Sequence, residues 1–175
     1  MTIAELDAMP AEQAHVLLQS CCGAPAWVRG MLAVRPFRSH DRLLAAANDR
    51  WYSLGQDDWL EAFAHHPQLG EQRAQAATTD QSRAWSATEQ VLVASGASDV
   101  RVALANANRE YAERFGYICI ICATGLGAEE ILRLTRARLG NAPDMEIGIA
   151  ASEQGKITRL RLERLVGQTS TQDSA

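Results

Sequence analysis

Residues 99–139 decide the fold of this chain, and they read DVRVALANANREYAERFGYICIICATGLGAEEILRLTRARL. In residues 99–115 apolar side chains recur at helical spacing, and Gly116 is placed to end a helix there. Residues 128–139 are typical of a second helix. The run between them, residues 117–122, is rich in β-branched side chains and is compatible with a buried strand. Because the sequence offers no second strand to pair with it, we interpret it as a buried extended or irregular segment that crosses a helical core.

Helical patterns also occupy most of the remaining chain. Pro10 and Gly23 bound one helix, and Ser39 is a candidate N-cap for another that stops by Gly55. The patterns predict helices over residues 10–23, 39–55, 57–66, 82–94 and 143–166, and a short helix before Pro36. We therefore expect an all-α protein, a single compact helical domain of about eight helices over residues 1–167 with a short disordered tail at 168–175. Residues 68–81 are polar and aperiodic, which is typical of a long functional loop or a loosely held helical turn.

Composition narrows the class of protein. The 175 residues carry a net charge of −4, and 47% of them are apolar, which favours one soluble globular domain. A chain with this acidic balance lacks the basic excess typical of nucleic-acid binders. The longest apolar run, residues 117–123, is far shorter than the ~20 residues of a membrane-spanning helix. The chain starts without a basic and apolar leader, so we expect a cytoplasmic protein whose four cysteines are reduced.

A histidine pair precedes a proline at the end of a predicted helix. The proline at position 67 disfavours helical backbone at His66 and so fixes where its ring points. Imidazole titrates near neutral pH, so His66 is a candidate general acid or base. Adjacent imidazoles do not share one helix face, so His65 and His66 are a poor metal pair. The alternative is a surface histidine at a helix terminus, and the residues alone favour that reading.

Ser86, Glu89 and Gln90 form a second candidate cluster. A serine followed three residues later by glutamate, before an apolar run, is the pattern of a helix capping box. The same hydroxyl, carboxylate and amide lie within about one helical turn and could converge on a small polar ligand. Glu89 could also accept a hydrogen bond from His66 and set its tautomer. On spacing alone the cap is the favoured interpretation.

Three further motifs have mainly structural interpretations. Cys119 and Cys122 have the spacing of a redox pair or of half a zinc site, but their apolar surroundings favour buried structural thiols. Gly125-Leu126-Gly127 lacks the rest of a phosphate loop and is interpreted as a helix entry, with Thr124 as a candidate cap. Near the C-terminus, arginines alternate with leucines. One arginine turned toward a pocket would clamp a substrate, and the pattern does not choose which: Arg159, Arg161 and Arg164.

The order of several short motifs resembles a known family. Their sequence along the chain is Arg35-Pro36-Phe37, His66-Pro67-x-Leu69, Ser86-x-x-Glu89-Gln90, Phe115-Gly116-Tyr117, Ala123-Thr124-Gly125, Ala128-Glu129-Glu130-Ile131-Leu132 and Lys156-Ile157-x-x-Leu160-Arg161-Leu162. Together they resemble 2-oxo-4-hydroxy-4-carboxy-5-ureidoimidazoline (OHCU) decarboxylase of urate breakdown, over about residues 10–166. The resemblance implies a single all-helical domain, usually a homodimer, that binds a small ureidoimidazoline and needs no metal or organic cofactor. The acidic balance and the short apolar runs of the sequence predict no nucleic-acid or membrane partner.

The resemblance also implies roles for individual residues. The family's catalytic histidine falls on His66 and not on His65, and Glu89 is its second catalytic group. Its C-terminal arginine, in Leu-Arg-Leu, falls on Arg161, and backbone groups of residues 118–123 would also hold the substrate. The loop between His66 and Ser86 is slightly longer than in some relatives. The full set of implied substrate-binding residues is Pro67, Ser86, Gln90, Ile118, Ile120, Ile121, Ala123 and Arg161.

The implied reaction is cofactor-independent decarboxylation of OHCU to (S)-allantoin. A competing hypothesis is a non-enzymatic helical interaction module, in which Ser86 and Glu89 only cap a helix and His66 has no catalytic role. A third is a thiol redox protein that uses Cys119 and Cys122. Thiol accessibility separates the third hypothesis from the others, because reactive thiols label quickly in the native state.

Overall fold

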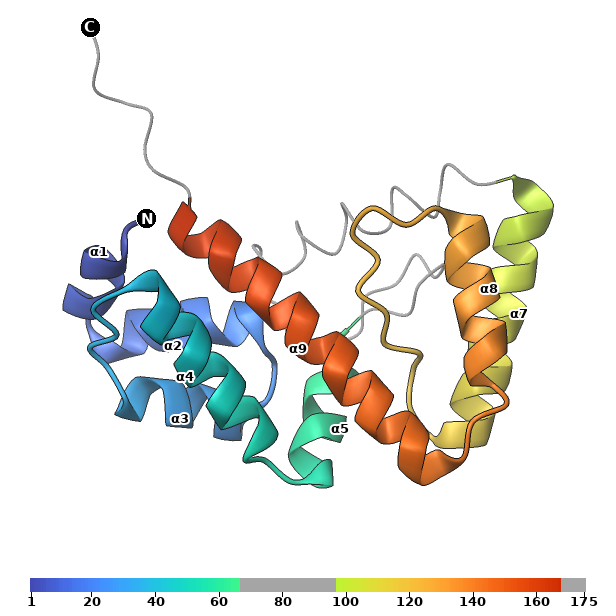
Figure 1. Ribbon diagram of the computed structural model, residues 1–175, viewed down its shortest axis with the longest axis horizontal. Coiled ribbons are helices and arrows are strands. Elements are labelled where there is room, and N and C mark those ends of the chain that lie inside the picture. Colours follow the sequence, from blue (N-terminus) through green and yellow to red (C-terminus); the bar gives the residue numbers. More distant parts are fainter. Residues whose placement is uncertain (67–96, 168–175) are drawn as a thin grey trace, which may run out of the picture. The chain divides into compact units, whose positions relative to one another are not determined.

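The computed structural model describes residues 1–66 and 97–167, and all regular secondary structure in these ranges is helical (Figure 1). This confirms the predicted all-α class. The described helices are α1 (Ile3–Ala8), α2 (Ala11–Cys21), α3 (Pro25–Ala33), α4 (His40–Tyr52), α5 (Gln56–Ala64), α7 (Ser98–Phe115), α8 (Ala128–Arg138) and α9 (Pro143–Gly167). The predicted loop at 68–81, the predicted helix at 82–94 and the predicted tail at 168–175 lie outside the described residues.

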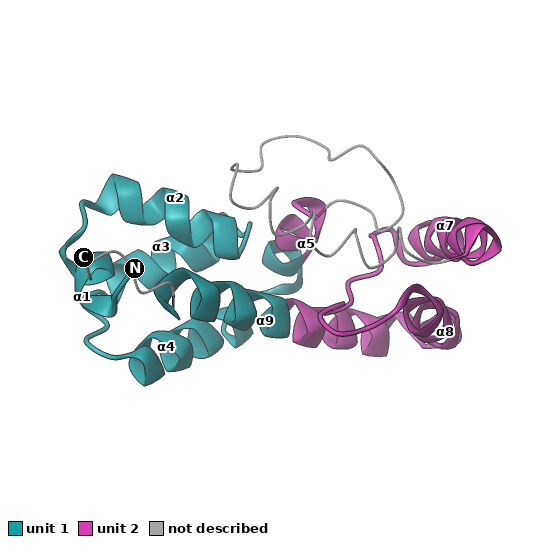
Figure 2. Ribbon diagram, turned by 90° about the horizontal axis from the view of Figure 1, so that it is seen from above, with its two compact units in different colours: residues 1–59, 155–175 teal, residues 60–154 magenta. Residues whose placement is uncertain are grey.

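The chain divides into two compact units (Figure 2). The first contains residues 1–59 and 155–175, and the second contains residues 60–154. Helices α5 and α9 each contribute residues to both units. The expectation of one domain over residues 1–167 stays a prediction.

In the first unit, helices α3 and α4 bury two tryptophans. Trp27 and Trp51 are almost fully buried, and the indole Nε1 of Trp27 donates to the carbonyl oxygen of Ala47 over 3.0 Å. Gly155, at the start of the part of α9 that belongs to this unit, lies against α4. A Cβ at this position would sit 3.4 Å from the hydroxyl oxygen of Tyr52 and 3.5 Å from the ring of Trp51. These are ordinary van der Waals distances, so a methyl group at position 155 would fill the space between α9 and α4 without a clash.

Helix α1 was not anticipated from the sequence pattern. Thr2 caps it, and Thr2 and Glu5 form a complete capping box, a signal in the first residues of the sequence. The end of this helix is held by the turn after α3. Arg35 Nη2 donates to the carbonyl oxygens of Leu6, Asp7 and Met9, and the Asp7 carboxylate accepts from the backbone N–H groups of Phe37 and Arg38, each over 2.8 Å. The Arg35-Pro36-Phe37 motif thus anchors α1.

Both ends of α4 can be compared with the ends predicted from the sequence. Ser39 caps α4 as predicted, because its hydroxyl accepts from the N–H of Arg42 over 3.3 Å. The helix ends at Tyr52 and not at Gly55. Ser53, just beyond it, donates its hydroxyl to the carbonyl oxygen of Arg50, a local bond that competes with helical continuation.

In the second unit, α7 packs against α8. Residues 118–123, the apolar segment, contribute Cys119, Ile121 and Ala123 to the core between these helices. Gly116 ends α7 as predicted, with a left-handed φ of 79° that glycine adopts at little cost. The prediction that Thr124 caps α8 is wrong. Gly127 is the N-cap, and a turn in which Leu126 N–H donates to the Ala123 carbonyl, with Gly125 at φ 82°, separates Thr124 from the helix.

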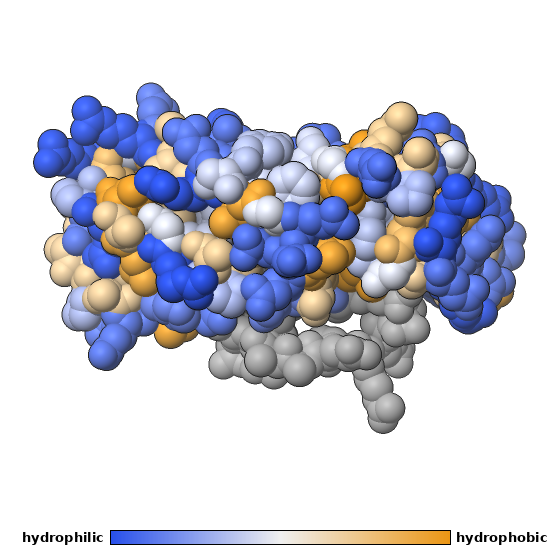
Figure 3. All heavy atoms as spheres, turned by 90° about the horizontal axis from the view of Figure 1, so that it is seen from below, coloured by the Kyte–Doolittle hydropathy of each residue, from blue (hydrophilic) through white to orange (hydrophobic). Residues whose placement is uncertain are grey.

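Polar and apolar side chains are interspersed on the described surface. On the face drawn in Figure 3, apolar side chains form small spots between polar ones. Within the described ranges, no helix is both long enough and apolar enough to cross a membrane.

We predict that Asp7→Ala lowers the free energy of unfolding by about 1–3 kcal/mol, because two backbone N–H groups lose a charged acceptor. Urea denaturation followed by far-UV circular dichroism measures the change. Asp49→Ala, at an exposed position on α4, is the control and should change stability by less than about 0.5 kcal/mol. Equal effects of the two substitutions would contradict the anchoring role of Asp7.

Candidate active site

The end of α5 separates the two adjacent histidines. The His65 ring Nδ1 donates to the carbonyl oxygen of Glu61 over 2.9 Å, which ties this imidazole to its own helix. His66 lies beyond the helix, half-buried, and its backbone N–H donates to the carbonyl of Phe63 over 3.1 Å. This agrees with the predicted exit from the helix at His66. Pro67 lies outside the described residues.

An aromatic contact joins α5 to the apolar segment. Phe63 is fully buried, and its ring centroid lies 5.4 Å from that of Tyr117, which directly precedes residues 118–123. His66 follows Phe63 by one helical turn. The second unit therefore holds the candidate acid/base residue and the candidate substrate-binding segment on elements that pack together.

Along residues 118–123, successive side chains differ in where they are buried. The side chains of Cys119, Ile121 and Ala123 are buried in the core formed with α7 and α8. At the intervening positions, Ile118 and Cys122 are half-buried, and Ile120 is buried but lies outside this core cluster. The structure thus confirms that the predicted extended or irregular segment is buried. Successive side chains of an extended backbone point to opposite sides, so the alternation favours the extended form. Because the side chains of Ile121 and Ala123 are in the core, these two residues offer a ligand mainly their backbone groups.

The backbone of this segment is partly satisfied by side chains. Arg138 Nη1 donates to the carbonyl oxygen of Ile120 over 2.6 Å, and the N–H of Cys122 donates to Glu153 Oε2 over 2.8 Å. Within the described part of the chain, the N–H and C=O of Ile121 have no hydrogen-bond partner, although the residue is only 6% exposed. Buried backbone groups in native proteins are nearly always paired. The peptide groups at Ile121 can therefore receive a polar ligand.

A buried ionic network surrounds the anchor on Ile120. The carboxylate of Glu146 is fully buried, and its Oε1 accepts from Arg138 Nε over 2.6 Å and from the Tyr111 hydroxyl over 2.5 Å. Its Oε2 accepts from Asn141 Nδ2 over 2.6 Å. Burial and the hydrogen bond to Glu146 raise the pKa of Tyr111, so its hydroxyl keeps its proton and donates it to the carboxylate.

Burial distinguishes one of the three C-terminal arginines. Arg161 is 4% exposed in the first unit, and its charge acts on the buried thiols of Cys21 and Cys22. Arg159 is exposed and its Nε pairs with Glu163 Oε1 over 2.9 Å. An arginine at a position this buried is uncommon and requires partners, which favours Arg161 over Arg159 as the candidate clamp.

Three of the four cysteines are buried thiols. Burial raises the pKa of Cys21 to about 12, that of Cys22 to about 11 and that of Cys119 to about 11. Cys122 is half-buried. Raised pKa values oppose the thiolate form that redox or metal-binding cysteines need. Within the described residues, no group of three or more histidine, cysteine or acidic side chains is arranged to hold a metal ion.

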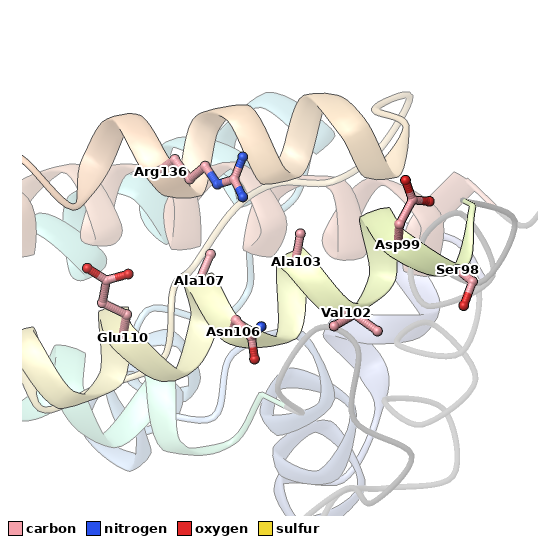
Figure 4. A pocket seen from close by; sticks show the side chains of 8 residues that line it. All are labelled: Ser98, Asp99, Val102, Ala103, Asn106, Ala107, Glu110 and Arg136. Carbon is pink, nitrogen blue, oxygen red and sulfur yellow. The ribbon is translucent and has the colours of Figure 1, made fainter.

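A shallow groove runs along α7 on the second unit, with a volume of about 650 Å³ (Figure 4). Asp99 and Glu110 project from α7 beside it, and Arg136 projects from α8. Of the described residues that line the groove, none belongs to the predicted site. We therefore do not place the predicted chemistry there.

The structure describes part of the predicted site. His66, Ile118, Ile120, Ile121 and Ala123 all belong to the second unit, and Arg161 belongs to the first. Four further predicted residues lie outside the described residues: Pro67, Ser86, Glu89 and Gln90.

Sequence reasoning missed three residues that hold the segment. Arg138 falls in the last turn of α8 and Glu146 in the first turn of α9. Basic residues at helix ends and acidic residues at helix starts are expected from the helix dipole, so the pattern gave no reason to single them out. Glu153 lies within a long helix where an acidic residue is usually solvated.

Comparison with solved structures identifies the class. The fold matches a crystal structure of OHCU decarboxylase determined in the presence of (S)-allantoin, with a TM-score of 0.75 and 31% identity, over 91% of this chain and all of that one. A structure of (S)-allantoin synthase matches with a TM-score of 0.64 and 18% identity, over 94% of this chain and 54% of that one, and it supports the fold alone. The fold is therefore that of an all-helical decarboxylase.

The chain belongs to the OHCU decarboxylase family, whose profile matches residues 7–163. It is 35% identical over 146 residues to the uric acid degradation bifunctional protein TTL of Arabidopsis thaliana, covering 83% of this chain and 45% of that protein. It is also 35% identical over 136 residues to a 2-oxo-4-hydroxy-4-carboxy-5-ureidoimidazoline decarboxylase of Amia calva, covering 75% of each. The chain thus spans about half the length of the bifunctional relative and three quarters of the other.

We predict that, in the native state at about pH 8, Ellman's reagent labels Cys122 first and the three buried thiols only as the chain unfolds. The chain unfolded in guanidinium chloride is the control and should react at all four cysteines. The folded thiols keep their protons above the ordinary thiol value of 9.0, whereas the unfolded chain loses them there. The free energy of unfolding should therefore fall as the pH rises above about 9. Rapid native labelling of Cys119 would contradict this account.

Proposed function

We propose that this chain decarboxylates OHCU to (S)-allantoin in urate degradation, without a cofactor. The observation that carries the proposal is the place of half-buried His66, one helical turn after Phe63. The Phe63 ring packs on Tyr117, which directly precedes the segment 118–123. Within that segment, the peptide groups of Ile121 have no hydrogen-bond partner among the described residues. Family membership supplies the reaction class. We further propose that the active protein is a cytoplasmic homodimer.

The substrate can hold the electrons that the reaction releases. When the bond to the carboxylate breaks, carbon dioxide leaves and its electron pair forms a double bond between ring carbons 4 and 5. The former C=N pair moves to the ring nitrogen, which takes up a proton from solvent. The 4-hydroxyl loses its proton to become a carbonyl, and carbon 5 gains a proton to give allantoin. Because the substrate is its own electron sink, the protein needs to orient the ring, stabilise charge and deliver the proton to one face.

We assign His66 to the proton transfers. It acts on the 4-hydroxyl as carbon dioxide leaves, or on the proton delivered to carbon 5. A half-buried imidazole can exchange protons with solvent and still contact a bound ring. Delivery from one side gives a single enantiomer, whereas the uncatalysed reaction gives both.

The remaining predicted residues bind and orient the substrate. Glu89 orients the His66 imidazole or accepts from the ureido N–H groups, and Pro67, Ser86 and Gln90 complete this part of the site. Ile118, Ile120, Ile121 and Ala123 act through backbone groups, but at Ile120 this leaves only the N–H, because Arg138 binds its carbonyl oxygen. Arg161 binds a ring carbonyl in preference to the departing carboxylate, because strong neutralisation of that carboxylate would stabilise the ground state.

We predict that His66→Ala lowers kcat by about 10²–10⁴-fold, the usual contribution of a general acid or base. Urate oxidase and hydroxyisourate hydrolase supply the substrate in situ, and circular dichroism of the allantoin formed measures both rate and handedness. The matched control is His65→Ala, since the His65 ring is bonded to its own helix. It should leave kcat unchanged.

Two results would contradict this assignment. Full activity of His66→Ala would remove the acid/base role while leaving the reaction in place. A racemic product formed at the same rate with and without the unmodified chain would remove the proposed reaction, and a helical interaction module would then become the leading hypothesis.

We predict that Arg161→Lys lowers kcat/KM by about 10- to 100-fold, since lysine cannot reproduce the forked hydrogen bonds of a guanidinium group. The same coupled assay measures it. Arg159→Lys is the matched control, because Arg159 pairs with Glu163 on the surface, and it should behave like the unmodified chain. Equal activity of the two variants would show that Arg161 does not bind substrate through a forked contact.

A further inference from the structure

We propose that Arg138 and Glu153 are positioning residues that hold the backbone of residues 118–123 in the register needed to bind substrate at Ile121. The inference rests on the proposed function and deepens it. All of the residues concerned belong to the second unit.

Arg138 and Glu153 bind backbone groups on one edge of the segment. Arg138 binds the carbonyl oxygen of Ile120, and Glu153 binds the N–H of Cys122. In an extended backbone the N–H and C=O of one residue point to the same edge, and those of the next residue point to the opposite edge. The Ile120 carbonyl and the Cys122 N–H therefore share one edge, and the N–H and C=O of Ile121 face the other.

The opposite edge presents a donor and an acceptor side by side. Such a pair is what an adjacent strand would bind in a sheet. Here it matches a small ligand that carries its own adjacent N–H and C=O groups, as the ureido and ring amide groups of the substrate do. Anchoring the Ile120 carbonyl and the Cys122 N–H on either side of Ile121 fixes the direction of both peptide groups before the ligand arrives.

The Glu146 carboxylate holds the Arg138 guanidinium in place. It accepts from Arg138 Nε, while Arg138 Nη2 donates to the Tyr111 hydroxyl over 3.2 Å and Nη1 reaches Ile120. The guanidinium is thus fixed by bonds from three of its nitrogens, one of them to the segment. A buried ion pair adds little stability over apolar residues of similar volume, because both charges lose their hydration. Its bond to Ile120 gives this pair a positional role that an apolar pair would lack.

The test uses substitutions at both anchors. Arg138→Lys keeps the charge opposite Glu146 but loses the fork that reaches Ile120, and Glu153→Ala removes the acceptor for Cys122. The matched controls are Arg133→Lys, on the same helix but in an exposed pair with Glu130, and Glu113→Ala, at an exposed position on α7. Glu153→Gln keeps an acceptor oxygen and should restore most of the activity lost in Glu153→Ala.

Three quantities are measured on each variant below its melting temperature. These are the amide hydrogen exchange of the peptide covering residues 117–127, the melting temperature, and kcat and KM in the coupled allantoin assay. We expect faster exchange confined to this peptide and a fall in kcat/KM of about 10- to 100-fold for Arg138→Lys and Glu153→Ala, because small misplacement of binding groups has effects of this size. The control variants should match the unmodified chain.

Other outcomes would overturn the inference. If exchange rises or melting temperature falls while kcat and KM stay unchanged, the network is structural only. If Arg138→Lys does not fold, the comparison of Glu153→Ala with Glu153→Gln decides, because the Glu153 side chain is half-buried and glutamine keeps an acceptor oxygen for the Cys122 N–H. A fully active unmodified chain with fully active anchor variants rejects the positioning role alone, whereas an inactive unmodified chain rejects the proposed function and the inference with it.

Discussion

The fully buried carboxylate of Glu146 is the constraint on which the second unit depends. A carboxylate inside a protein is costly unless each oxygen is paired, and Glu146 takes donors from three places: Tyr111 on α7, Arg138 on α8 and Asn141 before α9. Any rearrangement of these elements would leave the charge unpaired. Because Arg138 also holds the Ile120 carbonyl, the same requirement that fixes the helices fixes the segment between them.

This arrangement explains why an extended segment can exist in a helical protein. A single strand has no ladder partner, so its backbone groups must find others. Side chains of α8 and α9 bind backbone groups on one edge of the segment, and alternate side chains pack into the core. The peptide groups of Ile121 have no hydrogen-bond partner among the described residues. In the proposed reaction this edge orients the ring while His66 moves the proton. The substrate supplies the electron sink, so the protein contributes position and polarity.

Much of the helical pattern could be predicted from sequence, because apolar periodicity and end signals such as Ser39 and Gly116 act locally. Helix α1 was missed although its capping box is readable at Thr2 and Glu5. The extended segment was predicted from what it lacks, a partner strand. The anchors at Arg138 and Glu153 could not be predicted, because they pair with backbone atoms 18 and 31 residues away and no local pattern marks such contacts. The histidine and arginine of the candidate site were selected through family resemblance, since spacing alone favoured surface roles.

The central claim is that this helical chain removes the carboxylate of the ureidoimidazoline. Carbon-13 NMR of substrate labelled in that carboxylate, generated in situ, tests it most directly, because it follows the bond that breaks. We predict that the carboxylate signal decays into carbon dioxide and bicarbonate at a rate proportional to the concentration of the chain, in step with the appearance of allantoin. A decay rate that does not change with the concentration of the chain would contradict the claim.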